Sequence, residues 1–279
     1  MRPFQQVDVF SKQPLRGNPV AVVHDAEGLD TEQMERFTRW TNLSEATFLL
    51  PPTDPAADYA VRIFTQAGEL PFAGHPTLGS CHAWLAAGGR PRDPEQIVQE
   101  CPAGLIAIRP VDDVLAFAAP PTRRSGPVAA ADLARIARVL GIGREHILDS
   151  QWVDNGPGWV AVTLESVDAV LALRPSGDGE HIDLGVVGMY PEGEACAYEV
   201  RAIFTNDRRE IMEDPVTGSL NASLAQWLVG TRRVAPPYVA GQGTAMGRAG
   251  RVHISQDDDG AIWVGGATRT IVSGEVDVE

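Results

Sequence analysis

Two glycine-led segments of the chain could bind an anion. Gly74-His75 and Gly218-Ser219 each stand at the expected start of an apolar helix. A helix start offers unpaired N–H groups and the positive end of the helix dipole, so it attracts carboxylates and phosphates. Glycine lets a ligand approach the backbone closely, and His75 and Ser219 add side-chain donors. The alternative is that His75, Thr217 and Ser219 only cap their helices, but two matched starts favour anion binding.

Three carboxylates stand where they could take part in proton transfer. Glu213 and Asp214 precede the second helix start, where they could enter a site or only interact favourably with the helix dipole. Glu45 stands where a connection enters an apolar strand expected at 46–50. Partial desolvation there would favour its protonated form and suit it to moving a proton. The plainer alternative for Glu45 is a solvated glutamate of a loop.

Composition and charge exclude several classes of protein. The chain has 279 residues, with 23 Lys and Arg against 37 Asp and Glu, which gives a formal net charge of −14. A nucleic-acid-binding protein needs a basic face. No apolar run is long enough to span a bilayer, and the first residues do not resemble a signal peptide. Three widely spaced cysteines are typical of a reducing compartment. We therefore expect a cytoplasmic protein without nucleic-acid or membrane partners.

Common cofactor and nucleophile motifs are absent from the sequence. The segment 241–247 is rich in glycine, but Met246 stands where a dinucleotide fingerprint requires glycine, and the next residues favour a strand. There is no Walker sequence, no nucleophile elbow and no spacing of zinc ligands. His82, seven residues after His75, is expected to be a hydrogen-bonded histidine of the core. The residues therefore predict neither a cofactor nor a metal site.

The elements that would position the candidate residues occur twice. Alternating apolar residues predict strands at 4–10, 19–23, 46–50 and 59–65. A helix that is apolar nearly all round, Pro76–Ala87, follows and ends at two glycines. Proline is expected at the first helical position. Strands near 159–163 and 198–204 precede a second apolar helix, Leu220–Val229, which ends at Gly230. Both helices should be buried.

The repeated order predicts an internal duplication whose period is too long for a solenoid. Both halves contain a strand with Phe-Thr, then a glutamate, then a glycine at the helix start, then Trp-Leu. A buried helix needs a sheet around it, so we expect an α+β fold of two similar lobes. Each lobe would be a curved, mainly antiparallel sheet wrapped around one central helix. Residues 1–120 would form the first lobe, which a last strand at about 268–279 could complete, and 121–267 the second. The active site is expected in the cleft between the lobes.

At these residues the chain resembles the PhzF-like, or phenazine biosynthesis-like, protein family. The resemblance covers essentially the whole chain in order, and its motifs are long. It implies the diaminopimelate-epimerase-like fold, a homodimer and an isomerase that needs no cofactor. The best-known member shifts a hydrogen in trans-2,3-dihydro-3-hydroxyanthranilate. The matching segments are GNPVAVV from Gly17, NLSEATFL from Asn42, ELPFAGHPTLG from Glu69 and EDPVTGS from Glu213.

The resemblance also implies roles for individual residues. Glu45 matches the glutamate that moves the proton, and His75 and Asp214 match the residues that assist it. The substrate carboxylate is held at the helix starts, at positions that match Gly74, Gly218 and Ser219.

Departures from the family pattern leave the substrate open. Racemases of this fold use two cysteines at these turns, whereas here Ala73 precedes the first glycine and no cysteine is near, which disfavours thiol-based racemisation. Gln66 stands where many relatives have proline, and Asn221 where some have histidine. Two alternatives to the hydrogen shift remain. One is a cofactor-free epimerase or lyase that uses the same glutamate, and the other is a protein that binds a small molecule without catalysis.

Overall fold

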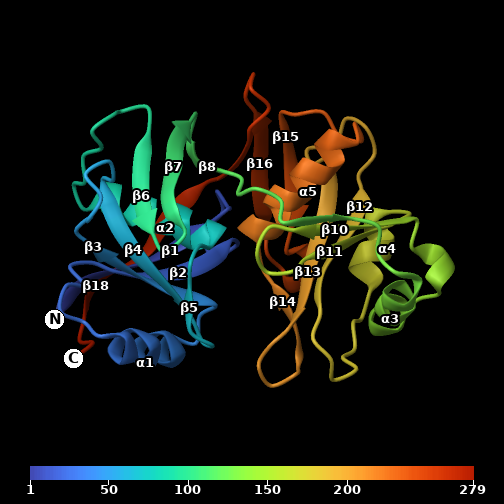
Figure 1. Ribbon diagram of the computed structural model, residues 1–279, viewed down its shortest axis with the longest axis horizontal. Helices are drawn as coiled ribbons and strands as arrows, with labels where there is room; N and C mark the ends of the chain where they lie inside the picture. The colour runs from blue at the N-terminus through green and yellow to red at the C-terminus, as the bar shows by residue number, and fades with distance from the viewer. The chain divides into compact units, whose positions relative to one another are not determined.

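The computed structural model describes residues 1–279, and its contacts divide the chain into two compact units. Unit 1 comprises residues 1–118 and 265–279, and unit 2 comprises residues 119–264. The sequence predicts a boundary near residue 120 and a C-terminal strand that could complete the first unit. Figure 1 shows both units as mixtures of many strands and few helices.

Unit 1 is a sheet built around one helix. Its elements are β1 (Arg2–Val9), β2 (Asn18–Val23), α1 (Thr31–Thr41), β3 (Glu45–Leu50), β4 (Tyr59–Thr65), β5 (Glu69–Leu70), α2 (Gly74–Ala86), β6 (Ile97–Cys101), β7 (Gly104–Val111), β8 (Val114–Ala118) and the C-terminal β18 (Thr268–Val276). β1 pairs antiparallel with both β18 and β2. The pairs β2–β3 and β4–β6 are parallel, and the pairs β3–β4, β4–β5, β6–β7 and β7–β8 are antiparallel.

Unit 2 repeats this pairing pattern nine strands later. Its elements are β9 (Arg124–Gly126), α3 (Ala130–Leu140), β10 (Asp149–Asp154), β11 (Val160–Leu164), α4 (Val167–Ala172), β12 (Asp183–Met189), β13 (Tyr198–Thr205), β14 (Ile211–Asp214), α5 (Gly218–Gly230), β15 (Tyr238–Gln242), β16 (Gly250–Gln256) and most of β17 (Ile262–Gly266), whose last two residues belong to unit 1. The pairs β11–β12 and β13–β15 are parallel, as β2–β3 and β4–β6 are in unit 1. The pairs β10–β11, β12–β13, β13–β14 and β15–β16 are antiparallel. The expected α+β fold of two similar, mainly antiparallel lobes is therefore confirmed.

The central helices α2 and α5 are largely buried because their residues are small or apolar on every side. In unit 1, α2 packs against β1, β2, β3, β6, β8 and β18 (Figure 1). Gly79 permits this closeness, since a Cβ there would lie 2.3 Å from the Val20 side chain.

Both central helices begin two residues earlier than the sequence indicated. α2 begins at Gly74, which makes Pro76 its third residue rather than its first. Pro76 lacks a backbone N–H, but α2 loses no hydrogen bond there, because the first four N–H groups of a helix have no partner inside the helix. The earlier starts bring both glycine-led segments into the first turns of the helices.

The remaining helices cover the outer faces of the two sheets. α1 begins with a capping box between Asp30 and Gln33 and packs its apolar side, including Phe37, on β3 and β4. In unit 2, α3 and α4 cover a second apolar cluster that includes Ile136 and Val170. None of the helices has the length and the continuous apolar surface that crossing a membrane would require.

Candidate functional site

The structure places Glu45 beside His75 in unit 1. Glu45 is the first residue of β3, and His75 is the second residue of α2. Glu45 Oε2 lies 3.3 Å from His75 Nε2, and the two side chains are 16 % and 5 % exposed. The sheet therefore brings together a carboxylate and an imidazole that lie 30 positions apart, in a setting largely shielded from water. Gly74 is also buried here, at the first turn of the same helix.

Burial holds His75 in its neutral form. Desolvation lowers the pKa of His75 from 6.5 to about 3, and a hydrogen bond with the Pro19 backbone opposes this only in part. The Asn18 amide nitrogen lies 3.3 Å from Nδ1 of the ring. The other ring nitrogen, Nε2, faces Glu45 Oε2. This arrangement suits proton exchange between the imidazole and the carboxylate.

The loop before Asn18 is fixed by a buried carboxylate. Asp8, only 2 % exposed, accepts hydrogen bonds from the backbone N–H groups of Arg16 and Gly17. A Cβ at position 17 would lie 2.1 Å from the Val9 carbonyl oxygen, so only glycine fits there. The sequence motif that begins at Gly17 thus positions the amide that contacts His75.

In unit 2, Asp214 lies within a network of buried polar groups. It ends β14, and the Thr217 hydroxyl donates to its Oδ2 at 2.5 Å. Gln242, fully buried at the end of β15, bonds to the Asp214 carbonyl and to both the N–H and the hydroxyl of Thr217. Asn221 is also fully buried and donates to Gln242. Asn221, one of the departures from the family pattern, therefore helps to hold the segment that bears Asp214.

The glycine-rich segment after Gln242 supports the same loop. Gly243 has φ +88°, and a Cβ there would lie 2.6 Å from the Pro215 carbonyl oxygen. A glycine is needed at this position for both reasons. The segment 241–247, which does not match a dinucleotide-binding motif, thus forms a close-packed turn against the loop that follows Asp214.

Ser219 is oriented by two side chains from the loop between β10 and β11. Trp159 Nε1 donates to the Ser219 hydroxyl at 3.1 Å, and Asn155 donates to the Ser219 carbonyl at 2.9 Å. The N-cap residues of the two central helices are Ala73 and Thr217, and neither makes a side-chain capping bond. The Thr217 hydroxyl therefore bonds to Asp214 and Gln242 rather than capping α5.

Glu213 is a structural residue rather than a proton donor. Its carboxylate forms two hydrogen bonds with Arg201, at 3.1 and 2.7 Å, and the Arg201 side chain is only 7 % exposed. Arg62 and Glu69 form the corresponding pair in unit 1, at 2.8 and 2.7 Å. Each unit thus holds an arginine–glutamate pair just before its central helix. Of the two neighbouring carboxylates Glu213 and Asp214, Asp214 remains the candidate for chemistry.

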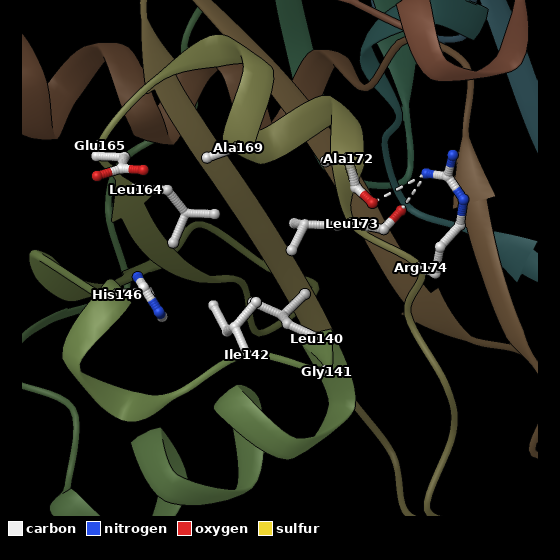
Figure 2. Close-up of a pocket in the computed structure, with 10 residues that line it drawn as sticks. All are labelled: Leu140, Gly141, Ile142, His146, Leu164, Glu165, Ala169, Ala172, Leu173 and Arg174. Carbon is white, nitrogen blue, oxygen red and sulfur yellow. Dashed lines mark hydrogen bonds between the residues drawn. The ribbon is translucent and has the colours of Figure 1, made fainter.

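Two other features do not join the candidate site. The three cysteines are buried, and desolvation raises the pKa of Cys81 to about 12, so this thiol is unsuited to act as a base. A shallow hollow of about 430 Å³ lies on unit 2 and is shown in Figure 2. It is mainly apolar, Arg174 binds the carbonyls of Ala172 and Leu173 at its edge, and none of its lining residues is a candidate.

Several residues that shape the site were not singled out from the sequence. Asn18 lies in a conspicuous Gly-Asn-Pro turn, and Gln242 in the glycine-rich segment, so a signal existed for both. No local pattern marks Trp159 or Asn155, because their contacts depend on how loops fold back onto α5. Gln66 is exposed and lies 3.4 Å from Asn42 and from the Leu43 carbonyl, so it contacts the connection that leads to Glu45.

Comparisons of the sequence and of the structure with known proteins point to the same family. The family described as phenazine biosynthesis-like protein matches residues 7–275. The chain is 33 % identical to the Schizosaccharomyces pombe protein named antisense-enhancing sequence 1, over 98 % of this chain and 97 % of that one. It is also 33 % identical to the trans-2,3-dihydro-3-hydroxyanthranilate isomerase of Pseudomonas fluorescens, over 87 % of this chain and 86 % of the relative. A crystal structure of a Bacillus anthracis PhzF-family protein superposes with a TM-score of 0.85 at 21 % identity, covering 99 % of this chain and 98 % of that one.

Proposed function

Since the chain belongs to the phenazine biosynthesis-like family, whose named enzymes support an isomerase, we propose that it catalyses a proton shift within a small substrate that bears a carboxylate. The reaction needs no cofactor. It resembles the reaction named for the trans-2,3-dihydro-3-hydroxyanthranilate isomerases among its relatives.

The observation that supports this proposal most directly is the pairing of Glu45 with a neutral, buried histidine. Glu45 Oε2 lies 3.3 Å from His75 Nε2, close to the start of a helix. In the proposed reaction Glu45 takes a proton from one carbon of the substrate and returns it to another carbon of the conjugated system. His75 exchanges protons with Glu45 or orients the substrate, and it stays neutral because burial lowers its pKa to about 3.

The substrate carboxylate is bound at the helix starts in this proposal. Gly74 and Gly218 lie in the first turns of α2 and α5, where backbone N–H groups and the helix dipole favour an anion. Ser219 adds a hydroxyl whose orientation Trp159 fixes. Asp214 assists the proton shift from the end of β14. In crystals grown with sulfate or a carboxylate, we expect density at Gly74-His75 and Gly218-Ser219, and empty density at both would contradict this binding mode.

The proposal is tested by following proton transfer directly. Trans-2,3-dihydro-3-hydroxyanthranilate is incubated with the protein in deuterated water, and NMR reports both the product and the position of deuterium. Replacing Glu45 by Gln keeps shape and hydrogen bonding but removes the base, so we expect the rate to fall by about 10²–10⁴-fold. A matched control is Glu32→Gln on the exposed face of α1, which should leave the rate unchanged.

Three outcomes would overturn parts of this proposal. If Glu45→Gln exchanges at the native rate while His75→Ala or Asp214→Asn abolishes exchange, the base is not Glu45. If deuterium enters at one carbon with inversion and no double bond moves, the enzyme is an epimerase. If carboxylates bind but none incorporates deuterium, the protein is a binder and not an enzyme.

A further inference from the structure

The loop between β10 and β11 is held by the carboxylate of Asp154, the last residue of β10. Asp154 Oδ1 accepts hydrogen bonds from the backbone N–H groups of Gly156 at 2.7 Å and of Gly158 at 2.9 Å. Both glycines have a positive φ, of +152° and +92°, which other residues rarely adopt. The Val153 N–H closes the loop by donating to the Trp159 carbonyl at 2.9 Å. The carboxylate and the two glycines therefore fix the position of Trp159.

This loop contacts the start of α5 through two largely buried side chains. Trp159 and Asn155 are 5 % and 6 % exposed, and both bond to Ser219, the second residue of α5. An indole N–H can only donate, so the Ser219 hydroxyl oxygen accepts from Trp159, and the hydroxyl proton is not used in that bond. The Ser219 proton is therefore available to an acceptor such as a carboxylate.

Unit 1 contains the same arrangement. Asp8, the last residue but one of β1, accepts from the Gly17 N–H at 3.0 Å, and Asn18 follows this glycine at the start of β2. The Asn18 amide nitrogen lies 3.3 Å from Nδ1 of His75, the second residue of α2. In each unit, an aspartate at the end of a strand binds a glycine, and the next residue contacts the second residue of the central helix. The aspartate and the glycine are the same in both units, whereas the residues in contact differ.

We propose that Asp154 is a positioning residue for the start of α5. Its carboxylate holds the loop so that the Trp159 N–H stays on the Ser219 oxygen, which leaves the Ser219 proton for the substrate carboxylate. This inference rests on the proposed function, in which Ser219 binds that carboxylate. Asp154 acts through the loop that carries Trp159, so the two residues contribute to substrate affinity as a single interaction.

The first experiment observes the bond between Trp159 and Ser219 without any substrate. The ¹⁵N–¹H signal of the Trp159 indole is assigned by its absence in Trp159→Phe, and Ser219→Ala shows its position when the bond is lost. Asp154→Ala removes both hydrogen bonds to the loop, so it should move the signal upfield toward that position. Asp154→Asn keeps an oxygen that can accept from both N–H groups, so its signal should stay close to the native one.

The second experiment measures what this bond contributes to substrate binding. With trans-2,3-dihydro-3-hydroxyanthranilate, Trp159→Phe should raise KM about three- to tenfold, the usual effect of one hydrogen bond, and leave kcat nearly unchanged. Asp154→Ala should have the same effect. The double variant should have the KM of Trp159→Phe alone, because one interaction can be lost only once. Partial unfolding would instead lower kcat and leave KM unchanged.

Asp259→Ala is the matched control for both experiments. Asp259 Oδ1 also accepts a backbone N–H two residues further along the chain, from Ala261 at 3.2 Å, but in the turn between β16 and β17. Its replacement should change neither the indole signal nor KM.

The outcomes separate this inference from the proposed function. A native indole signal in folded Asp154→Ala would overturn the inference, and so would increases in KM that multiply in the double variant. Equal shifts in Asp154→Ala and Asp154→Asn would also overturn it, because they would assign the effect to charge rather than to the two hydrogen bonds.

Two further results are decided in advance. If Asp154→Ala does not fold, Asp154→Ser is used: its shorter side chain should shift the indole signal by a smaller amount, and a native signal would overturn the inference. If the native protein does not convert trans-2,3-dihydro-3-hydroxyanthranilate, the proposed function fails, yet the indole signal still decides whether Asp154 holds the bond between Trp159 and Ser219.

Discussion

His75 should make the stability of the protein depend on pH in a way that can be calculated. Its pKa is 6.5 in the unfolded chain and about 3 in the folded protein. Between these values the unfolded chain binds a proton that the folded protein does not, so the free energy of unfolding falls as the pH drops below 6.5. At pH 5 the loss from this one group is about 2 kcal/mol, and it approaches about 5 kcal/mol below pH 3, because a tenfold change in proton affinity corresponds to ~1.4 kcal/mol.

The prediction is tested with His75→Gln, which keeps a polar side chain of similar length but does not titrate in this range. Urea unfolding of both proteins is measured at pH 8 and pH 5. We expect the native protein to lose about 2 kcal/mol more than the variant on going to pH 5. Burial also lowers the pKa values of His24 and His82, but these residues are present in both proteins and cancel in the difference.

An exposed histidine provides the control for this measurement. His146 has a side chain that is 58 % exposed, so His146→Gln should keep the full pH dependence of the native protein. Equal losses for the native protein and His75→Gln would refute the reasoning, because they would mean that the folded protein accepts a proton on His75 as readily as the unfolded chain does.

Further predictions concern packing and the buried ion pair, and urea unfolding checks each of them. Gly79→Ala should destabilise the protein by about 1–3 kcal/mol, because the added Cβ would lie 2.3 Å from the Val20 side chain. Gly230→Ala at the end of α5 meets no atom within 4 Å and should be neutral or stabilise by up to about 1 kcal/mol, so equal effects of the two changes would contradict the packing argument. Arg201→Met should cost about 3–5 kcal/mol, because it leaves a largely buried glutamate without its partner. Arg62→Met should cost less than about 1 kcal/mol, because its ion pair is about a quarter exposed, and the reverse order would show that burial does not set the strength of these pairs.

The sequence by itself determined the two central helices and the duplication around them. Residues that are small or apolar on every side of a helix leave no face for water, so a helix with this composition has to be buried. The glycines and the order of strand, turn and helix are local features, and the structure repeats them with the same parallel and antiparallel pairs in both units. The exact helix starts were misplaced by two residues. A proline fits any position in the first turn, so it does not mark which residue comes first.

Only the tertiary structure decided which polar groups meet. Glu45 and His75 come together because the chain places the start of β3 beside the start of α2. Gln242 reaches Thr217 because β15 runs parallel to β13. Glu213 and Asp214 are neighbours in the chain, yet one forms an ion pair with Arg201 and the other accepts from Thr217. Neighbouring side chains of a strand point to opposite faces of the sheet, so their surroundings depend on elements far away in the sequence.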